Sequence, residues 1–165
     1  MAQKIKIGLI GAGMFGGDVH LRAFADVQRY GLSGFLARLG LDQYSRPLAG
    51  VEFELAAVAT RSERSAARAA DSFAQITGHR PETFHGDEPW NDVLARHPDL
   101  DILAVATPDN LHCAPVLAGI AAGCHIVVEK PMCLDMEEAD QIVAAAKAAG
   151  RVVCVDMHKR FDPDH

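Results

Sequence analysis

The strongest constraint on the fold is a regular alternation of short apolar runs with longer segments of helical periodicity. The apolar runs lack the polar alternation of a strand with one solvated face, so they indicate parallel strands buried on both sides. Helical segments between such strands predict an α/β fold of the Rossmann type: a doubly wound parallel sheet in three α/β/α layers. The expected strands are Lys4–Ile10, Phe53–Ala59, Thr83–His85, Asp101–Ala106, His125–Val128 and Val152–Val155; the expected helices are Met14–Val27, Glu63–Ile76, Trp90–Arg96, one ending at Ala122, and Met136–Ala149.

The predicted helix ends have their own sequence signals. Thr60–Glu63 and Asp135–Glu138 each place a capping oxygen three residues before a carboxylate, which is the pattern of a helical N-terminal box. Gly123 and Gly150 follow predicted helices and are expected to adopt the left-handed conformation that ends them. These signals agree with the periodicity.

The segment Tyr30–Gly50 does not fit this pattern, because it inserts about twenty residues between the first helix and the second strand. Phe35–Leu39 within it is expected to form a short helix. No function follows from its sequence.

A glycine-rich loop follows the first predicted strand, and the sequence from Gly11 to Gly16 has the spacing GxGxxG. Gly11 allows a tight turn, Gly13 lets the backbone approach a pyrophosphate, and Gly16 lets the helix pack closely on the sheet. The start of that helix offers N–H groups to the phosphates. We therefore expect the loop to bind a dinucleotide; the alternative is a turn that only connects two packed elements. The candidate cofactor-binding residues of the loop are Gly11, Ala12, Gly13, Met14, Phe15 and Gly16.

The end of the second strand bears on which dinucleotide is bound. NAD-binding domains usually carry Asp or Glu there for the ribose 2′-hydroxyl, whereas this chain has Thr60, Arg61, Ser62 and Arg64. The arginines could bind a 2′-phosphate and the hydroxyl residues could assist, so the pattern favours NADP over NAD. The alternative is that both arginines lie on a solvated helix face.

Composition narrows the possible partners and the compartment. The chain of 165 residues has a net charge of −6, without a basic stripe for nucleic acid. No apolar run is long enough for a membrane helix. The four cysteines show no metal-binding spacing, so we expect no metal site and thiols in a reducing cytoplasm.

Four motifs together resemble one family of oxidoreductases. They are GLIGAGMFG after the first strand, ATPDNLH from Ala106 to His112, EKP from Glu129 to Pro131, and HKRFDP from His158 to Pro163. This combination is similar to the glucose–fructose oxidoreductase / inositol dehydrogenase / rhizopine catabolism (Gfo/Idh/MocA) family.

The resemblance implies a two-domain NAD(P)-dependent enzyme acting on a sugar, inositol or related polyol. Residues 1–155 would be its NAD(P)-binding domain, with the insertion at about 30–50. Residues 156–165 would begin the connection to a C-terminal substrate domain that lies outside this chain and usually mediates homo-oligomerisation. We expect the chain to be a fragment; the alternative is a naturally isolated cofactor module.

The resemblance also implies roles for the ATPDNLH motif. Ala106, Thr107 and Pro108 would line the pocket beside the nicotinamide ribose. His112 would begin the following helix, and either a cofactor contact or a structural role is compatible with that position. Asp109 departs from the asparagine that relatives often carry.

Lys130 of the EKP motif is the main candidate catalytic residue, since the family lysine lies near the nicotinamide and the reacting hydroxyl. Glu129 belongs to the same cofactor-binding motif, but adjacent strand residues face opposite sides, so we expect its carboxylate to be engaged elsewhere. We hypothesise that the Lys130-Pro131 bond is cis, which would fix the direction of the lysine at the carboxyl edge of the sheet. His158 replaces a frequent asparagine and could assist proton transfer or bind a sugar hydroxyl. The remaining histidines, including His20, are interpreted as structural or surface residues.

The sequence thus predicts the cofactor domain of a sugar or polyol dehydrogenase. The alternative from another class is a non-catalytic NAD(P)-binding sensor or regulatory module.

Overall fold

The structure, a computed structural model, describes residues 3–14, 16–45, 48 and 50–161. Six strands form one sheet in the order β3-β2-β1-β4-β5-β6, and all neighbouring strands are parallel. The strands are β1 (Gln3–Ile10), β2 (Val51–Thr60), β3 (Glu82–His85), β4 (Ile102–Val105), β5 (His125–Glu129) and β6 (Val153–Asp156). The chain winds outward from β1 in both directions, which confirms the predicted doubly wound Rossmann fold.

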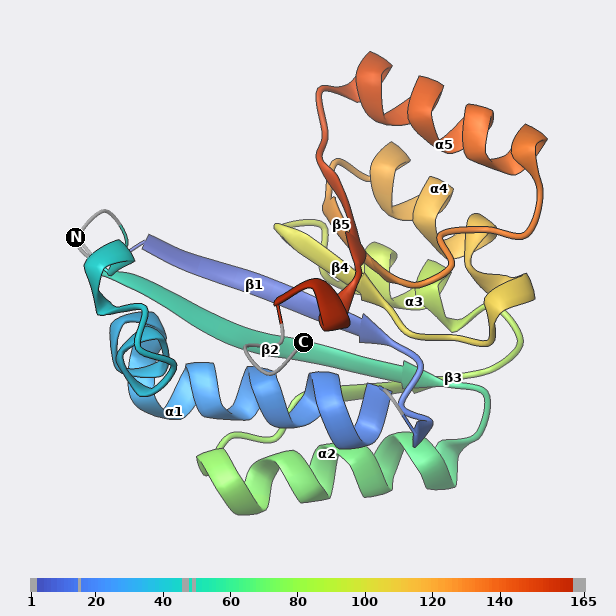
Figure 1. Cartoon of the computed structure of the whole chain (residues 1–165). Helices are drawn as coiled ribbons and strands as arrows, with labels where there is room; N and C mark the ends of the chain where they lie inside the picture. Colours follow the sequence, from blue (N-terminus) through green and yellow to red (C-terminus); the bar gives the residue numbers. More distant parts are fainter. Residues whose placement is uncertain (1–2, 15, 46–47, 49, 162–165) are drawn as a thin grey trace.

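Helices form a layer on each side of the sheet (Figure 1). α1 and α2 cover one face, while α3, α4 and α5 cover the other. The helices are α1 (Leu21–Arg38), α2 (Glu63–Thr77), α3 (Pro89–Arg96), α4 (Cys113–Ala121) and α5 (Met136–Ala149), with a π-helical turn η1 (Gly16–His20) and the 3-10 turns η2 (Asp42–Tyr44), η4 (Asp109–Leu111) and η5 (His158–Phe161). Among the described helices, none combines the length and apolar character that crossing a membrane requires.

Two apolar cores lie on opposite faces of the sheet, as the apolar strands predict. Leu9 of β1 packs with Phe73 of α2 on one face, and both are fully buried. The next strand residue, Ile10, belongs to the second core with Ile126 and Ile142. Successive residues of a strand face opposite sides, so β1 contributes to both cores.

One predicted helix cap is wrong. α2 begins with Ser62 as its N-cap, and the Ser62 hydroxyl accepts from the backbone N–H of Ser65. The Thr60 hydroxyl instead donates to the Ser62 carbonyl at 2.8 Å, which closes the turn before the helix. Ser62 lies one residue before the helix and has the required spacing to Ser65, so it caps in place of Thr60. The caps at Asp135, Gly123 and Gly150 are confirmed.

The first helical segment is longer than predicted. Met14 is helical, as predicted, and the turn η1 begins at Gly16. The helix that follows runs past the predicted end at Val27. Gly31 has the non-helical angles φ 69° and ψ 160°, so α1 consists of two helical stretches that meet at a kink. The second stretch contains Phe35–Arg38, where the short helix was predicted. The Arg38 guanidinium lies over the Tyr30 ring at 4.6 Å from its centroid, a cation–π contact that joins the two halves.

The α1 side of β5 and β6 is only partly covered. Val127 and Cys154 are register partners on this side; Val127 is half-buried and Cys154 is exposed. Two residues further along, Glu129 and Asp156 are partners on the same side, at the carboxyl ends of the strands.

Candidate functional site

The glycine loop lies at the centre of the sheet, between the carboxyl ends of β1, β2 and β4. Gly11 has φ 93°, and a Cβ there would lie 2.4 Å from the Ala106 carbonyl oxygen. A Cβ at Gly16 would lie 2.1 Å from the Gly11 carbonyl oxygen. Gly13 differs, because a Cβ there would meet no atom within 4 Å. Gly11 and Gly16 are thus required by the protein's own packing, whereas Gly13 borders open space.

A pocket of about 810 Å³ runs along this edge of the sheet. Its lining includes Gly11, Ala12, Gly13, Met14, Thr60, Arg61, Ala106, Thr107 and Pro108, which are nine of the candidate residues from sequence. In doubly wound folds, ligands bind where the strand order reverses, here between β1 and β4. Phe15 lies outside the described residues.

The end of β2 supplies one wall of this pocket. The Thr60 side chain is buried, with its hydroxyl turned toward Ser62 and Ser65, so it is already bonded within the protein. Arg61 is exposed and pairs with Asp87 at 3.5 Å between Nε and Oδ1. Ser62 and Arg64 do not line the pocket. Arg61 is therefore the candidate from this segment whose side chain is best placed to meet a ligand.

His112 joins the two loops at the opposite end of the pocket. Its ring is fully buried, with Nε2 2.8 Å from the Thr107 carbonyl and Nδ1 2.7 Å from the Pro131 carbonyl. Carbonyl oxygens only accept, so a ring nitrogen that carries a hydrogen donates to the carbonyl that it faces. This ring holds the ATPDNLH loop against the EKP loop, which favours the structural role left open by the sequence.

Lys130 follows β5 directly and is exposed. The Lys130-Pro131 peptide bond is cis, which confirms that expectation. β4 and β5 are paired up to Val105 and Val128, and the His112 contacts continue that alignment into the loops. Lys130 therefore lies next to the Thr107 end of the pocket, although it does not line the pocket itself.

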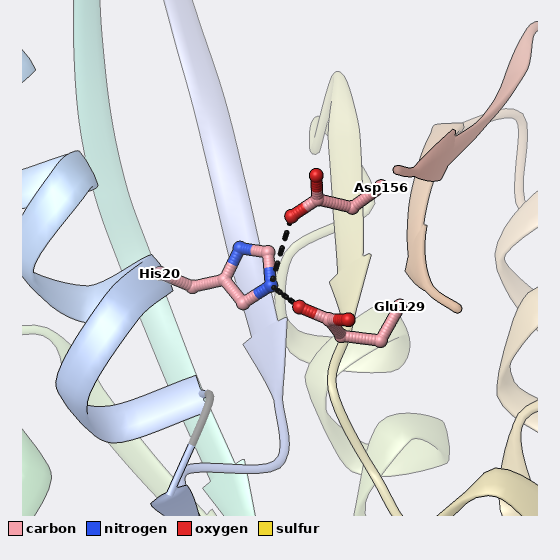
Figure 2. Close-up of side chains that lie close together, drawn as sticks. All are labelled: His20, Glu129 and Asp156. Carbon is pink, nitrogen blue, oxygen red and sulfur yellow. Dashed lines mark hydrogen bonds and ion pairs between the residues drawn. The ribbon is translucent and has the colours of Figure 1, made fainter. Parts of the chain in front are cut away.

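The Glu129 carboxylate is engaged elsewhere, as predicted from its position on the strand. Glu129 is buried, and its Oε1 lies 2.7 Å from Nε2 of His20 (Figure 2). Asp156 Oδ2 is 3.6 Å from the same nitrogen. His158 begins η5 just beyond Asp156 and is half-buried.

Several lining residues were not identified from the sequence. The unpredicted lining residues are Ile10, Ala59, Ser65, Arg68, Gly86, Asp87, Glu88, Pro89, Trp90, Leu111 and Ala114. The acidic pair Asp87-Glu88 could have indicated this part of the pocket, because it follows the carboxyl end of the short predicted strand. A second pocket of about 530 Å³ lies between the glycine loop and α2, and Arg68 lines both pockets.

Known proteins show the same combination of fold and sequence. Residues 5–157 match the model of the oxidoreductase family with an NAD-binding Rossmann fold. Inositol 2-dehydrogenase 4 of Saccharopolyspora erythraea is 30% identical over 99% of this chain and 39% of its own length. The scyllo-inositol 2-dehydrogenase (NADP(+)) IolW of Bacillus subtilis is 35% identical over 55% of this chain and 27% of its own length.

A solved structure of a dehydrogenase has a similar fold over nearly all of this chain. The WlbA dehydrogenase from Bordetella pertussis in complex with NADH and UDP-GlcNAcA superposes with a TM-score of 0.66 and 26% identity, over 96% of this chain and 36% of that one. The chain thus spans well under half the length of these relatives. The family model covers nearly all of the chain. The chain therefore belongs to the Gfo/Idh/MocA oxidoreductase family and corresponds to the NAD-binding Rossmann fold of that family.

Proposed function

We propose that this chain is the cofactor-binding domain of an NAD(P)-dependent oxidoreductase that transfers a hydride between a sugar, inositol or related polyol and nicotinamide. One observation carries the proposal: an open glycine loop begins a pocket that reaches Thr107, and His112 holds the Thr107 loop against the loop of Lys130. The inositol dehydrogenases among its relatives support the substrate class. Parts of the protein beyond this chain would complete the substrate site and mediate homo-oligomerisation.

Different residues of the pocket fit different parts of the cofactor. The cradle at Gly13 would receive the pyrophosphate, and Arg61 would face the adenosine ribose. Thr107 and Pro108 would lie beside the nicotinamide ribose. When bound, the cofactor supplies the hydride chemistry, and the protein must orient the substrate and move the hydroxyl proton.

Lys130 would take or give that proton at its Nζ. It lies at the carboxyl edge of the sheet, and a lysine acts as a base where a neighbouring positive charge disfavours its ammonium form. His158 would bind a substrate hydroxyl or assist the transfer, since η5 follows the neighbouring strand β6. These roles agree with the family resemblance of EKP and HKRFDP.

Lys130→Ala in the complete protein tests the catalytic role. We expect kcat to fall by about 10² or more, the typical contribution of general acid–base catalysis, with the cofactor Kd changed little. Lys147→Ala is the matched control, because Lys147 is an exposed lysine on α5 away from the pocket. An unchanged kcat for Lys130→Ala would refute the role, and cofactor binding without turnover in the wild-type protein would support a sensor instead.

We propose NADP rather than NAD as the preferred cofactor. Arg61 and Arg68 are cations that line the pocket, and a 2′-phosphate would compete with Asp87 for Arg61. Asp87 could instead accept from a ribose hydroxyl, which would favour NAD. Titrations of the wild type, Arg61→Ala and Asp87→Asn with NADPH and NADH separate the two. We expect Arg61→Ala to weaken NADPH selectively and Asp87→Asn to strengthen it; NADH binding at least as tightly, with no effect of Arg61→Ala, would contradict the preference.

A further inference from the structure

A buried polar cluster joins three segments beside the proposed site. His20 ends η1 directly after the glycine loop, Glu129 ends β5, and Asp156 ends β6 (Figure 2). The His20 and Glu129 side chains are only 9% and 7% exposed, while Asp156 is 25% exposed. The proposed reaction assigns no role to His20.

Charge explains why a histidine lies here. Glu129 and Asp156 are register partners on neighbouring strands, and like charges directly opposite each other in a sheet are destabilising. The His20 Nε2–H group points between them, donating to Glu129 at 2.7 Å. A buried carboxylate without such a donor would carry a large desolvation penalty. His20 is therefore the donor that allows Glu129 to be buried at the end of β5.

The two oxygens of Glu129 point to different partners. Oε1 accepts from His20, whereas Oε2 accepts from the backbone N–H of Lys130 at 3.2 Å. Two hydrogen bonds in series thus connect the turn that follows the glycine loop with the backbone of the proposed catalytic lysine. A carboxylate fixed at one oxygen also holds the other in a defined direction.

We propose that His20 is a positioning residue, which acts through Glu129 to hold the backbone of Lys130 in register with the glycine loop. Asp156 extends this link to β6 and so to the segment that carries His158. The inference rests on the proposed catalytic role of Lys130. It predicts that the loop that receives the cofactor and the lysine that moves the proton are mechanically coupled.

The test compares His20→Leu with His20→Gln, which keeps an N–H donor. Amide hydrogen exchange at Lys130 is measured by NMR on this chain, together with the NADPH dissociation constant; kcat is measured on the complete protein. We expect His20→Leu to speed exchange at the Lys130 amide about tenfold and to lower kcat by a similar factor, with the dissociation constant within about threefold. His20→Gln should restore both quantities to within about threefold of the wild type.

The control is His79→Leu, a half-buried histidine whose Nε2 contacts the Leu55 carbonyl far from Lys130. It should change the melting temperature without changing exchange at Lys130. If His20→Leu does not fold, Glu129→Gln preserves the side-chain volume while removing the charge, and it should change exchange and kcat in the same direction.

Three results would overturn the inference. The first is unchanged Lys130 exchange in His20→Leu and Glu129→Gln. The second is a loss of kcat that His20→Gln does not rescue. The third is a stoichiometric divalent metal in the purified wild-type protein that is lost in both His20 variants, because the three side chains place ligand atoms within 4.8 Å of one another and would then form a metal centre. The exchange measurement needs no turnover, so it is independent of two other results: an unchanged kcat in Lys130→Ala would refute the catalytic role of the lysine, and a wild-type protein without turnover would refute the proposed function.

Discussion

Adding one methyl group at Gly16 or at Gly13 separates two requirements of the glycine loop, its packing in the protein and its approach to a ligand. The Gly16→Ala methyl would lie 2.1 Å from the Gly11 carbonyl oxygen and 3.3 Å from Ala106 Cβ. The start of the helix must therefore move by about 1 Å, and such overpacking costs about 1–3 kcal/mol. For a domain of this size we expect the melting temperature to fall by roughly 2–12 °C.

Gly13→Ala should leave the stability of the protein nearly unchanged and weaken cofactor binding. Its methyl group meets no protein atom within 4 Å, so we expect the free energy of unfolding to change by less than about 0.5 kcal/mol. The same methyl would occupy the space through which a pyrophosphate approaches the backbone. We expect NADPH affinity to fall at least about tenfold, which corresponds to about 1.4 kcal/mol.

Both quantities are measurable on this chain. Thermal unfolding by circular dichroism gives the stability of each variant. Quenching of Trp90, the single tryptophan of the chain and part of the pocket lining, reports NADPH binding. If Gly13→Ala binds NADPH with wild-type affinity while remaining folded, the cofactor does not approach the loop and the reasoning is refuted.

Three further predictions concern the scaffold. Asp135→Ala removes the oxygen that accepts from the Glu138 backbone N–H at 2.8 Å, and should lower the free energy of unfolding in urea by about 1 kcal/mol; no change would show that α5 does not depend on this cap. The Lys4 ammonium lowers the pKa of Glu54, so this pair stabilises the fold above the usual carboxyl pKa of 4.5, and that stability is lost as the pH falls through the lowered value. Lys4→Met should reduce the free energy of unfolding at pH 7 by less than about 1 kcal/mol and should make that free energy fall less steeply at acid pH. An unchanged dependence of the free energy of unfolding on pH would contradict this prediction. Alkylation at neutral pH should modify exposed Cys154 before Cys124, because Cys124 is buried and burial raises the pKa of its thiol; equal rates by mass spectrometry would be incompatible with the fold.

Local patterns were sufficient to predict the fold and much of the pocket. Every predicted strand lies within two residues of the observed one at each end. The signal is clearest in β4 and β5, whose continuous apolar runs are typical of strands buried on both faces. The glycine spacing predicted the loop that begins the pocket, and the family resemblance of the ATPDNLH motif implied that Ala106–Pro108 line the same pocket, as they do. Cis Lys130-Pro131 was also expected from the sequence and is present.

The parts that could not be predicted depend on contacts between distant segments. His20 and Glu129 are 109 residues apart, and no local pattern indicates that pair. Asp87 and Trp90 enter the pocket because β3 pairs beside β2, which is a property of the sheet as a whole. The first helix extends beyond the predicted end at Val27, and the second helical stretch of α1, after the kink at Gly31, contains the short helix predicted at Phe35–Leu39.

The most direct test of the account is a crystal structure of this chain with NADP bound. We predict the pyrophosphate against Gly13, the adenosine ribose beside Arg61, and the nicotinamide at the Thr107 end of the pocket, on the side of Lys130. A dinucleotide bound away from the glycine loop, or with its nicotinamide at the Arg61 end, would contradict the assignment of both the pocket and the lysine.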